Sequence, residues 1–352
     1  MAIAVLLMAI AAAFAILTED GRSTGTTPPL PAVEPRAPPV VARRCSAEEI
    51  AALTAPADGE AAPYRLTCFA TLPAGAVVSR RVLLEGAEAS GAGVDCGGGA
   101  IGRPGQVGGL DQPTIAVWSR AEADGWSVPR DVRLLDCTVH GNLRVWGLGR
   151  ADMDALRESS RRADHTARAR AAGPSGLRLE DVTLVATETI PLYVGPGVTG
   201  VRMVGGGFRG RSVSTAVYLD AESAGAVIQG VDFDIDTGRE QIAVDGSAGN
   251  RIVDNDFDLD GRGGVFLYRN CGEDGVIRHQ TPSGNVIAGN RFDDAAWVRP
   301  RPVVVGSREG RRRYCGDDAG WPFGSSVDDG DRATGNGVAG NSVSYRWLPD
   351  GS

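Results

Sequence analysis

Apolar and polar residues alternate strictly in four short segments of the chain. The segments are Pro191–Gly195, Ala216–Asp220, Gln241–Asp245 and Gly264–Tyr268, and each follows an out-in-out-in-out pattern. Their first residues lie 23 to 25 positions apart. Alternation with period two predicts β-strands, and self-similarity at this spacing is typical of a solenoid whose turns bury their apolar faces on one another. The pattern predicts coils of about 24 residues.

A second series of apolar positions supports this register. Each member ends a segment like Arg251–Phe257, and the series comprises Val139, Leu184, Phe208, Phe233, Phe257, Phe292 and Val343. The wider steps at both ends of the series indicate coils that carry inserted loops. Asn255, Asn290 and Asn341 occupy one equivalent position in it, so we expect them to stack at a bend and to hydrogen-bond along the solenoid axis.

Short connections between such strands require each coil to pair in parallel with the next. The chain is therefore predicted to be all-β, a right-handed parallel β-helix. In these repeats it resembles the pectate-lyase-like superfamily of secreted β-helix proteins, from about Val132 to Val343. The resemblance implies architecture more than reaction, because that superfamily contains lyases, hydrolases, epimerases, esterases and non-catalytic adhesins.

The segments outside the repeats predict export and a modular layout. Residues 2–17 form an unbroken apolar run, typical of a signal-peptide core or a membrane anchor, and a proline-rich linker follows. The expected layout is a signal or anchor at 1–20, a disordered tether at 21–44, an N-terminal cap with the first coils at 45–131, and the β-helix at 132–346. Insertions are expected at 147–176, 271–284 and 306–335. This layout predicts a periplasmic or secreted protein, tethered to the membrane if the anchor is retained.

Six cysteines without a Cys-x-x-Cys spacing predict disulfides rather than a metal site. Pairing by proximity in the sequence joins Cys45 to Cys68, Cys96 to Cys137 and Cys271 to Cys315. Free buried thiols are the alternative.

The charge of the chain narrows the classes of partner. The formal net charge is −8 and every one of the 36 basic residues is arginine. A chain this acidic has no overall attraction for nucleic acid or an anionic membrane, so an acidic polymer would need a local arginine patch. The lack of lysine removes a Schiff-base mechanism. We expect a monomer that binds a polysaccharide.

The segment 151–172 differs from the repeats in being rich in helix formers and lacking Gly and Pro. Its charged residues are mixed among the helix formers, so no apolar stripe is expected. The segment is predicted to form a basic helical lid over the outward strand residues. Arg161, Arg162 and His165 are its candidate substrate-binding residues. The alternative is a solvated helix whose arginines pair with nearby acids.

Two columns of side chains point outward from the four aligned segments. One contains the aromatic residues Tyr193, Tyr218 and Phe266, and the other contains Asp220 and Asp245. Neighbouring members lie one rung, about 4.8 Å, apart. A close carboxylate pair can act as general acid and base or bind Ca²⁺, and aromatic rings can pack on sugar faces. Alternatively, the two aspartates cap bends.

The segment 267–280 follows the last aligned strand and concentrates polar chemistry where a loop leaves the scaffold. Arg269 could neutralise a substrate carboxylate, as could Arg278, while Tyr268 or His279 could transfer a proton. The predicted catalytic set is therefore Asp220, Asp245, Tyr268, Arg269 and His279. No metal site is assigned and the cofactor is unknown, although Ca²⁺ is compatible with the acidic residues.

These features predict an exported carbohydrate-active enzyme that acts on an anionic polysaccharide as a lyase, epimerase or hydrolase. The alternative is a non-catalytic, envelope-tethered β-helix protein that binds glycan or has a structural role.

Overall fold

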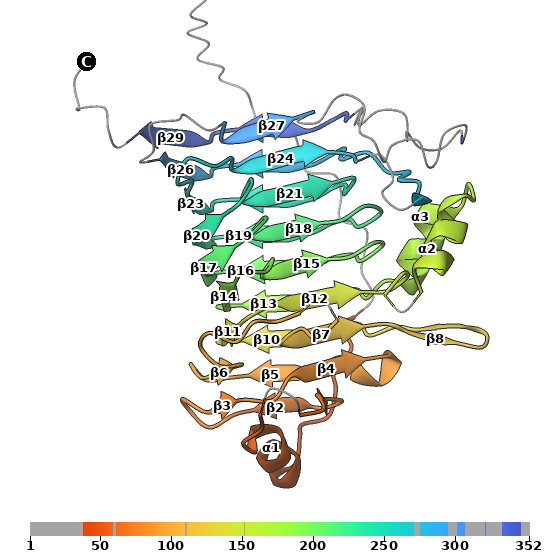
Figure 1. Cartoon of the computed structure of the whole chain (residues 1–352), viewed down its shortest axis with the longest axis vertical. Helices are drawn as coiled ribbons and strands as arrows, with labels where there is room; N and C mark the ends of the chain where they lie inside the picture. Colours follow the sequence, from red (N-terminus) through yellow and green to blue (C-terminus); the bar gives the residue numbers. More distant parts are fainter. Residues whose placement is uncertain are drawn as a thin grey trace, which may run out of the picture. The chain divides into compact units, whose positions relative to one another are not determined.

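The computed structural model describes residues 38–58, 61–109, 111–150, 152–270, 275–294, 301–306, 321 and 333–345. In this part of the chain, three parallel sheets of nine strands each run through consecutive coils (Figure 1). Each coil contributes one strand to every sheet, and each strand pairs with its equivalent in the next coil. The predicted parallel β-helix is confirmed.

We number the sheets by the first strand that each contains. Sheet 1 consists of β1 (Tyr64–Arg65), β4 (Val82–Glu85), β7 (Ile115–Trp118), β12 (Leu143–Trp146), β15 (Leu192–Val194), β18 (Val217–Leu219), β21 (Ile242–Asp245), β24 (Val265–Tyr268) and β27 (Val303–Val305). Sheet 2 consists of β2 (Phe69–Thr71), β5 (Gly93–Asp95), β10 (Arg133–Leu135), β13 (Arg178–Glu180), β16 (Arg202–Val204), β19 (Val227–Gln229), β22 (Arg251–Val253), β25 (Val286–Ala288) and β28 (Gly337–Ala339). Sheet 3 consists of β3 (Val77–Val78), β6 (Ala100–Ile101), β11 (Thr138–His140), β14 (Thr183–Thr187), β17 (Gly207–Ser212), β20 (Asp232–Thr237), β23 (Asp256–Asp258), β26 (Arg291–Asp294) and β29 (Ser342–Tyr345).

The core follows the predicted inward positions. Leu192, Val217, Ile242 and Val265 are partners in successive strand pairs and are all buried. The phenylalanine series of sheet 3 stacks through the core, with ring centroids 4.4 to 4.8 Å apart from one coil to the next. Such stacking removes large apolar faces from water while keeping one register.

Asparagines form the predicted ladder at a bend. The Asn255 side-chain amide donates to Asn290 Oδ1 at 2.9 Å, and Asn290 donates in the same way to Asn341 at 2.9 Å. A second ladder, Asn250–Asn285–Asn336, follows the same geometry and was not predicted. Each buried amide of these ladders satisfies backbone groups that would otherwise lose their hydrogen bonds to water.

The N-terminal end of the solenoid is closed by α1 (Ala47–Thr54), whose N-cap Ser46 forms a capping box with Glu49. The adjacent Cys45–Cys68 disulfide and the Cys96–Cys137 disulfide are both present, as predicted. Cys271 and Cys315 lie outside the described residues. Residues of the predicted tether also reach this end of the fold, since Val40 N donates to Asp131 at 3.0 Å.

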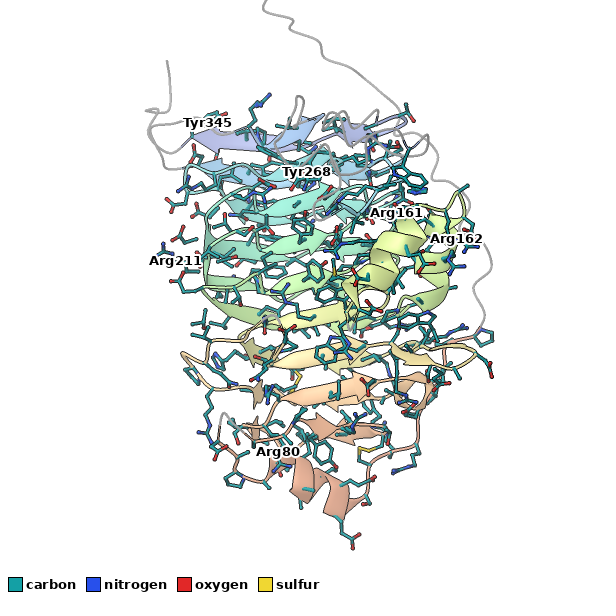
Figure 2. The ribbon with its side chains drawn as sticks, turned by 45° about the vertical axis from the view of Figure 1, so that its right-hand side comes forward. Arg80, Arg161, Arg162, Arg211, Tyr268 and Tyr345 are labelled. Atoms are coloured by element: carbon teal, nitrogen blue, oxygen red, sulfur yellow. A yellow bond between two sulfur atoms is a disulfide. The ribbon has the colours of Figure 1, made fainter. Side chains whose placement is uncertain are left out.

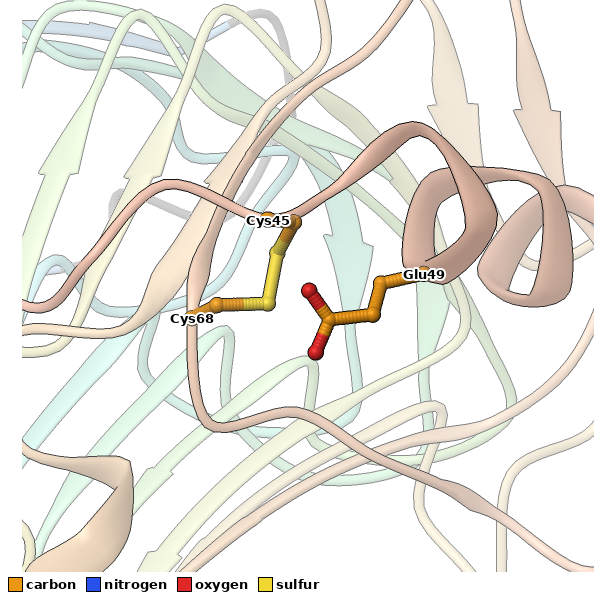
Figure 3. A group of neighbouring side chains, drawn as sticks. All are labelled: Cys45, Glu49 and Cys68. Atoms are coloured by element: carbon orange, nitrogen blue, oxygen red, sulfur yellow. A yellow bond between two sulfur atoms is a disulfide. The ribbon is translucent and has the colours of Figure 1, made fainter.

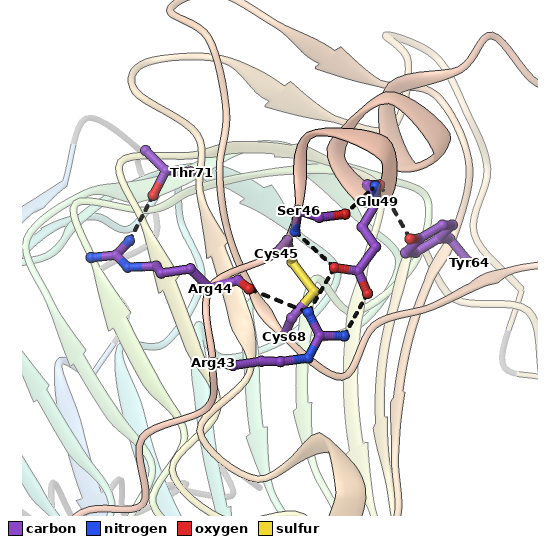
Figure 4. Close-up of a disulfide and its surroundings, with 8 residues drawn as sticks. All are labelled: Arg43, Arg44, Cys45, Ser46, Glu49, Tyr64, Cys68 and Thr71. Carbon is purple, nitrogen blue, oxygen red and sulfur yellow. Dashed lines mark hydrogen bonds and ion pairs between the residues drawn. A yellow bond between two sulfur atoms is a disulfide. The ribbon is translucent and has the colours of Figure 1, made fainter.

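Cys45, Glu49 and Cys68 are the one group of three or more candidate metal ligands in the described ranges (Figure 3). The two sulfurs are bonded to each other, and the Glu49 carboxylate accepts two hydrogen bonds from Arg43, at 2.5 and 2.7 Å (Figure 4). The hydrogen bonds from Arg43 and from the Ser46 backbone lower the pKa of Glu49 to about 2. This cluster has a structural role and does not bind a metal, because each candidate ligand atom is already held in the disulfide or in hydrogen bonds.

Insertions follow several strands of sheet 1. A hairpin of β8 (Arg120–Glu122) and β9 (Gly125–Ser127), which was not expected from the sequence, follows β7, and the short helix η1 (Ala87–Ala89) follows β4. The predicted helical segment is two helices, α2 (Met153–Ser160) and α3 (His165–Ala172), beside the carboxyl ends of β15 and β18 (Figure 1).

The helical insertion has an apolar face, contrary to the expectation from its sequence. Leu156, Ala169 and Ala172 are buried in a small cluster with Leu148. These apolar residues come from two short helices and the preceding loop, so they do not form the single apolar stripe that would predict a buried helix face from the sequence. None of the described helices is long and apolar enough to cross a membrane, and the predicted signal or anchor lies outside the described residues.

Candidate functional site

A cavity of about 120 Å³ lies between sheet 1, the helical insertion and the segment 276–278. Its described lining comprises Trp146, Met153, Leu156, His165, Tyr193, Pro196, Asp220, Ala221, Glu222, Val276, Ile277 and Arg278. Outward residues of β12 and β15, and Asp220 directly after β18, thus meet the predicted lid. A small cavity that combines an apolar wall with a few convergent polar groups is typical of a ligand site.

The aromatic wall continues the predicted outer column. Tyr193 and Tyr218 are register partners with ring centroids 5.9 Å apart, and Trp146 meets the edge of Tyr193 at 5.3 Å. Tyr218 is next to Ala243, and Phe266 follows one coil later. Phe266 is therefore in the predicted column but two coils from Tyr218, and it is not among the described residues of the cavity lining.

Asp220 and Asp245 lie on adjacent coils, as predicted, but they are not a bare carboxylate pair. Arg278 Nη1 donates to Asp220 Oδ1 at 2.7 Å and to Asp245 Oδ2 at 2.8 Å. Tyr193 donates its hydroxyl to Asp220 at 2.5 Å, and Tyr218 donates to Asp245. One guanidinium therefore bridges the two aspartates, a cation that their spacing in the sequence did not indicate.

Burial and charge oppose each other in this triad of Asp220, Asp245 and Arg278. Asp245 is fully buried, and burial raises its pKa although Arg278 and the donors of Tyr218 and Asn270 favour the ionised form. Burial likewise opposes the charge of Arg278, but the two carboxylates raise the pKa of Arg278 well above its usual value. Asp220 lines the cavity, whereas Asp245, one coil further along, is not among its described lining residues.

Glu222 is a second carboxylate of the cavity and was not predicted. It is fully buried, and its Oε1 accepts from the backbone N–H groups of His279 at 2.8 Å and Gln280 at 3.1 Å. Its Oε2 accepts from the hydroxyl of Thr166 in α3. Both oxygens are thus occupied, and Glu222 ties the helical insertion to the segment 275–281.

The two histidines singled out from the sequence face each other across the joint between these segments. The ring centroids of His165 and His279 are 5.0 Å apart. His165 lines the cavity and contacts Ser159 Oγ at 3.0 Å, whereas His279 Nε2 lies 2.6 Å from the Ser160 carbonyl oxygen. Burial lowers the pKa of His165 to about 4, so its ring is neutral at pH 7.

The remaining predicted site residues do not reach the cavity. Tyr268 is 1% exposed, and its hydroxyl forms hydrogen bonds with Glu240 at 3.0 Å and with Arg239 at 2.7 Å. The next residue, Arg269, is also buried. Neither lines the cavity within the described ranges. Arg161 and Arg162 are exposed on the helical insertion (Figure 2), and Arg162 lies 3.6 Å from Asp164. The insertion forms the cavity wall through Met153, Leu156 and His165 instead.

Trp146 and Glu222 are the site residues that sequence reasoning missed. Trp146 is the register partner of Trp118 in the preceding coil. In the following coil, the Gly195 N–H donates to the Val145 carbonyl oxygen, which places Gly195 opposite Trp146. Trp146 therefore continues the outer column that contains Asp220. Its strand is recognisable in the sequence as an equivalent of the later strands, but nothing in the repeat marks this tryptophan as a cavity residue. Glu222 adopts a positive φ of 66°, and no sequence signal marked it.

Comparisons with known proteins leave the family of the chain open. No protein-family model matches it, and no curated protein matches it. Among solved structures, it is similar to the Streptococcus pneumoniae surface protein and adhesin PfbA, with 12% sequence identity and a TM-score of 0.37. The match covers 64% of this chain and 69% of that one. It assigns no activity.

Proposed function

We propose that this protein is an exported glycan-binding β-helix protein whose cavity takes one sugar residue. The observation that carries the proposal is the aromatic wall of Trp146 and Tyr193 in the same cavity as the polar groups of Asp220 and Arg278. The apolar face of a sugar packs on aromatic rings while its hydroxyls bond to charged groups. A volume of about 120 Å³ suits a single ring rather than a long stretch of chain.

Binding is favoured over catalysis by the state of the carboxylates. Of the five predicted catalytic residues, only Asp220 is among the described residues of the lining. A two-carboxylate mechanism needs a second acidic group that can exchange a proton with the substrate. The other carboxylate of the cavity, Glu222, is fully buried and accepts three hydrogen bonds.

Export is supported by the apolar N-terminal run of the sequence and by the two disulfides, since disulfides persist mainly in oxidising compartments. A periplasmic, secreted or surface-attached location gives the protein access to extracellular or envelope polysaccharides.

Titration calorimetry with a panel of mono- and oligosaccharides tests the proposal. Trp146→Ala should weaken binding of the best saccharide about five- to thirtyfold, because about 1–2 kcal/mol of aromatic packing would be lost. Trp118→Ala is the matched control, since Trp118 is one coil away in the same column and outside the described lining. Equal losses in both variants, or no saccharide bound by the folded wild-type protein, would refute a binding site at Trp146.

A catalytic role for the same cavity is a second candidate, because Asp220 faces it and is held by Tyr193 and Arg278. Incubation with uronate polymers, with and without Ca²⁺, and with aryl glycosides would detect lyase or hydrolase turnover. Turnover that disappears in Asp220→Asn would favour an enzyme, and its lack on every substrate would leave the binding function.

A further inference from the structure

Arg144 is a buried arginine whose charge has no partner in the described part of the chain. It occupies an outward position of β12, in register with Ala116 on one side and Tyr193 on the other. Arg144 is 2% exposed, its Nε makes no hydrogen bond, and its guanidinium forms no ion pair or hydrogen bond with any of the described residues. By contrast, the buried Arg278 contacts two carboxylates.

The only described partner of this guanidinium is an aromatic ring. Arg144 Cζ lies 5.0 Å from the centroid of the Tyr193 ring. A cation–π contact stabilises a cation by less than the burial of an unpaired ion costs, and an arginine does not escape this cost by losing its proton. Burial lowers the pKa of Arg144, because removing the charged guanidinium from water is unfavourable. The arrangement therefore lacks an anion.

The position of Arg144 connects it to the proposed sugar site. Arg144 and Trp146 are two residues apart on β12, so their side chains leave the same face of the strand about 7 Å apart. Tyr193 contacts both of them and also lines the cavity. Arg144 is not itself among the described lining residues, so the Tyr193 ring is what joins it to the cavity.

We propose that Arg144 is an oxyanion subsite that accepts the carboxylate of a uronic acid or the sulfate ester of a sulfated sugar. A guanidinium offers paired N–H donors to either planar or tetrahedral oxyanions. The inference rests on the proposed glycan-binding function and names its substrate class, an anionic polysaccharide. It also replaces the exposed Arg161 and Arg162 as the source of that specificity.

Two measurements on the full folded protein test the subsite. Calorimetry compares glucose, glucuronate and glucose 6-sulfate on the wild type, on Arg144→Met and on the control Arg161→Met. The wild type and the control should bind one of the anionic sugars at least tenfold more tightly than glucose. Arg144→Met should bind all three with the affinity that the wild type has for glucose. The preferred anionic sugar distinguishes a uronate site from a sulfate-ester site.

The second measurement needs no sugar ring, so it separates this inference from the proposed function. Thermal unfolding is followed in sodium acetate, sodium sulfate and sodium chloride at equal ionic strength, because small oxyanions are suitable probes for a group that is only 2% exposed. Acetate or sulfate should raise the Tm of the wild type above its value in chloride, and the increment should be absent in Arg144→Met.

The outcomes are distinct. Glucose binding without anionic preference, or a preference that survives in Arg144→Met, overturns the oxyanion subsite and leaves the glycan site intact. An oxyanion increment in Tm without any saccharide binding supports the subsite and removes the glycan proposal. Arg144→Gln serves for both measurements if Arg144→Met does not fold.

Discussion

Arg278 should be the most sensitive residue of the cavity to substitution. Its guanidinium lies 2.7 Å from Asp220 and 2.8 Å from Asp245. The Arg278 side chain is 13% exposed, that of Asp220 is 10% exposed, and that of Asp245 is 0% exposed. Arg278→Met removes the cation and leaves two buried carboxylates on adjacent coils. Breaking a buried ion pair by removing one partner costs about 3–5 kcal/mol, and both remaining charges are stranded here. We expect a loss of about 3–5 kcal/mol in the free energy of unfolding, or roughly 5–10 °C in Tm.

The loss should depend on pH with a defined sign. Arg278 favours the ionised form of Asp245, whose pKa burial already raises, so its removal leaves burial less opposed and raises the pKa of Asp245 further above the unfolded value. The folded variant then binds more protons than the unfolded chain, so its stability falls as pH rises through the raised pKa and recovers as pH is lowered below it. Urea unfolding of the wild type and Arg278→Met between pH 5 and pH 8 would show a difference that narrows toward pH 5.

Arg291 provides a matched control for this measurement. It lies 2.8 Å from Asp256 and 3.9 Å from Asp293, so it also bridges aspartates of adjacent coils, but its side chain is 60% exposed. Arg291→Met should cost at most about 1 kcal/mol because exposed ion pairs contribute little. A loss in Arg278→Met no larger than in Arg291→Met, or one that grows as pH falls, would refute the buried-triad argument.

Three further predictions concern the scaffold. Replacing both Cys96 and Cys137 by serine opens a link with a sequence separation of 41, and loop-closure entropy predicts a loss of about 4 kcal/mol in urea unfolding; an unchanged midpoint would contradict the disulfide's role. Asn290→Ala removes the ladder bonds to Asn255 and Asn341, and about 2–4 kcal/mol should be lost because buried amide groups are left unsatisfied, which calorimetric unfolding would measure. The capping box at Glu49 contributes stability above the pKa of about 4.5 that this residue has when unfolded, and the contribution should disappear as pH falls toward about 2; Glu49→Gln should flatten the acid limb of the pH–stability curve in this window, and an identical curve would contradict the assignment.

The sequence by itself determined the scaffold. The side chains of a strand alternate between its two faces, so a repeated five-residue pattern was enough to separate the buried Leu192 from the outward Tyr193 and to stack one coil on the next. The asparagine ladder was predictable for the same reason, because each asparagine closes the same type of segment in its coil even where inserted loops lengthen the step between coils. Two disulfides followed from cysteines that are close in the sequence. All of these features depend on local geometry copied from coil to coil.

Only the tertiary structure decided how the site is assembled. Arg278 reaches Asp220 across 58 residues and Thr166 reaches Glu222 across 56, and both contacts depend on the path of insertions that do not share the repeat. The same insertions placed Trp146 in the cavity wall and turned Arg161 and Arg162 outward. Periodicity predicts which face of the sheet a residue occupies. The energy of a buried charge, however, depends on which oppositely charged side chain contacts it, and periodicity does not predict that contact. A non-repeating loop supplies that partner for Asp220, and the unpaired charge of Arg144 is likewise visible only in three dimensions.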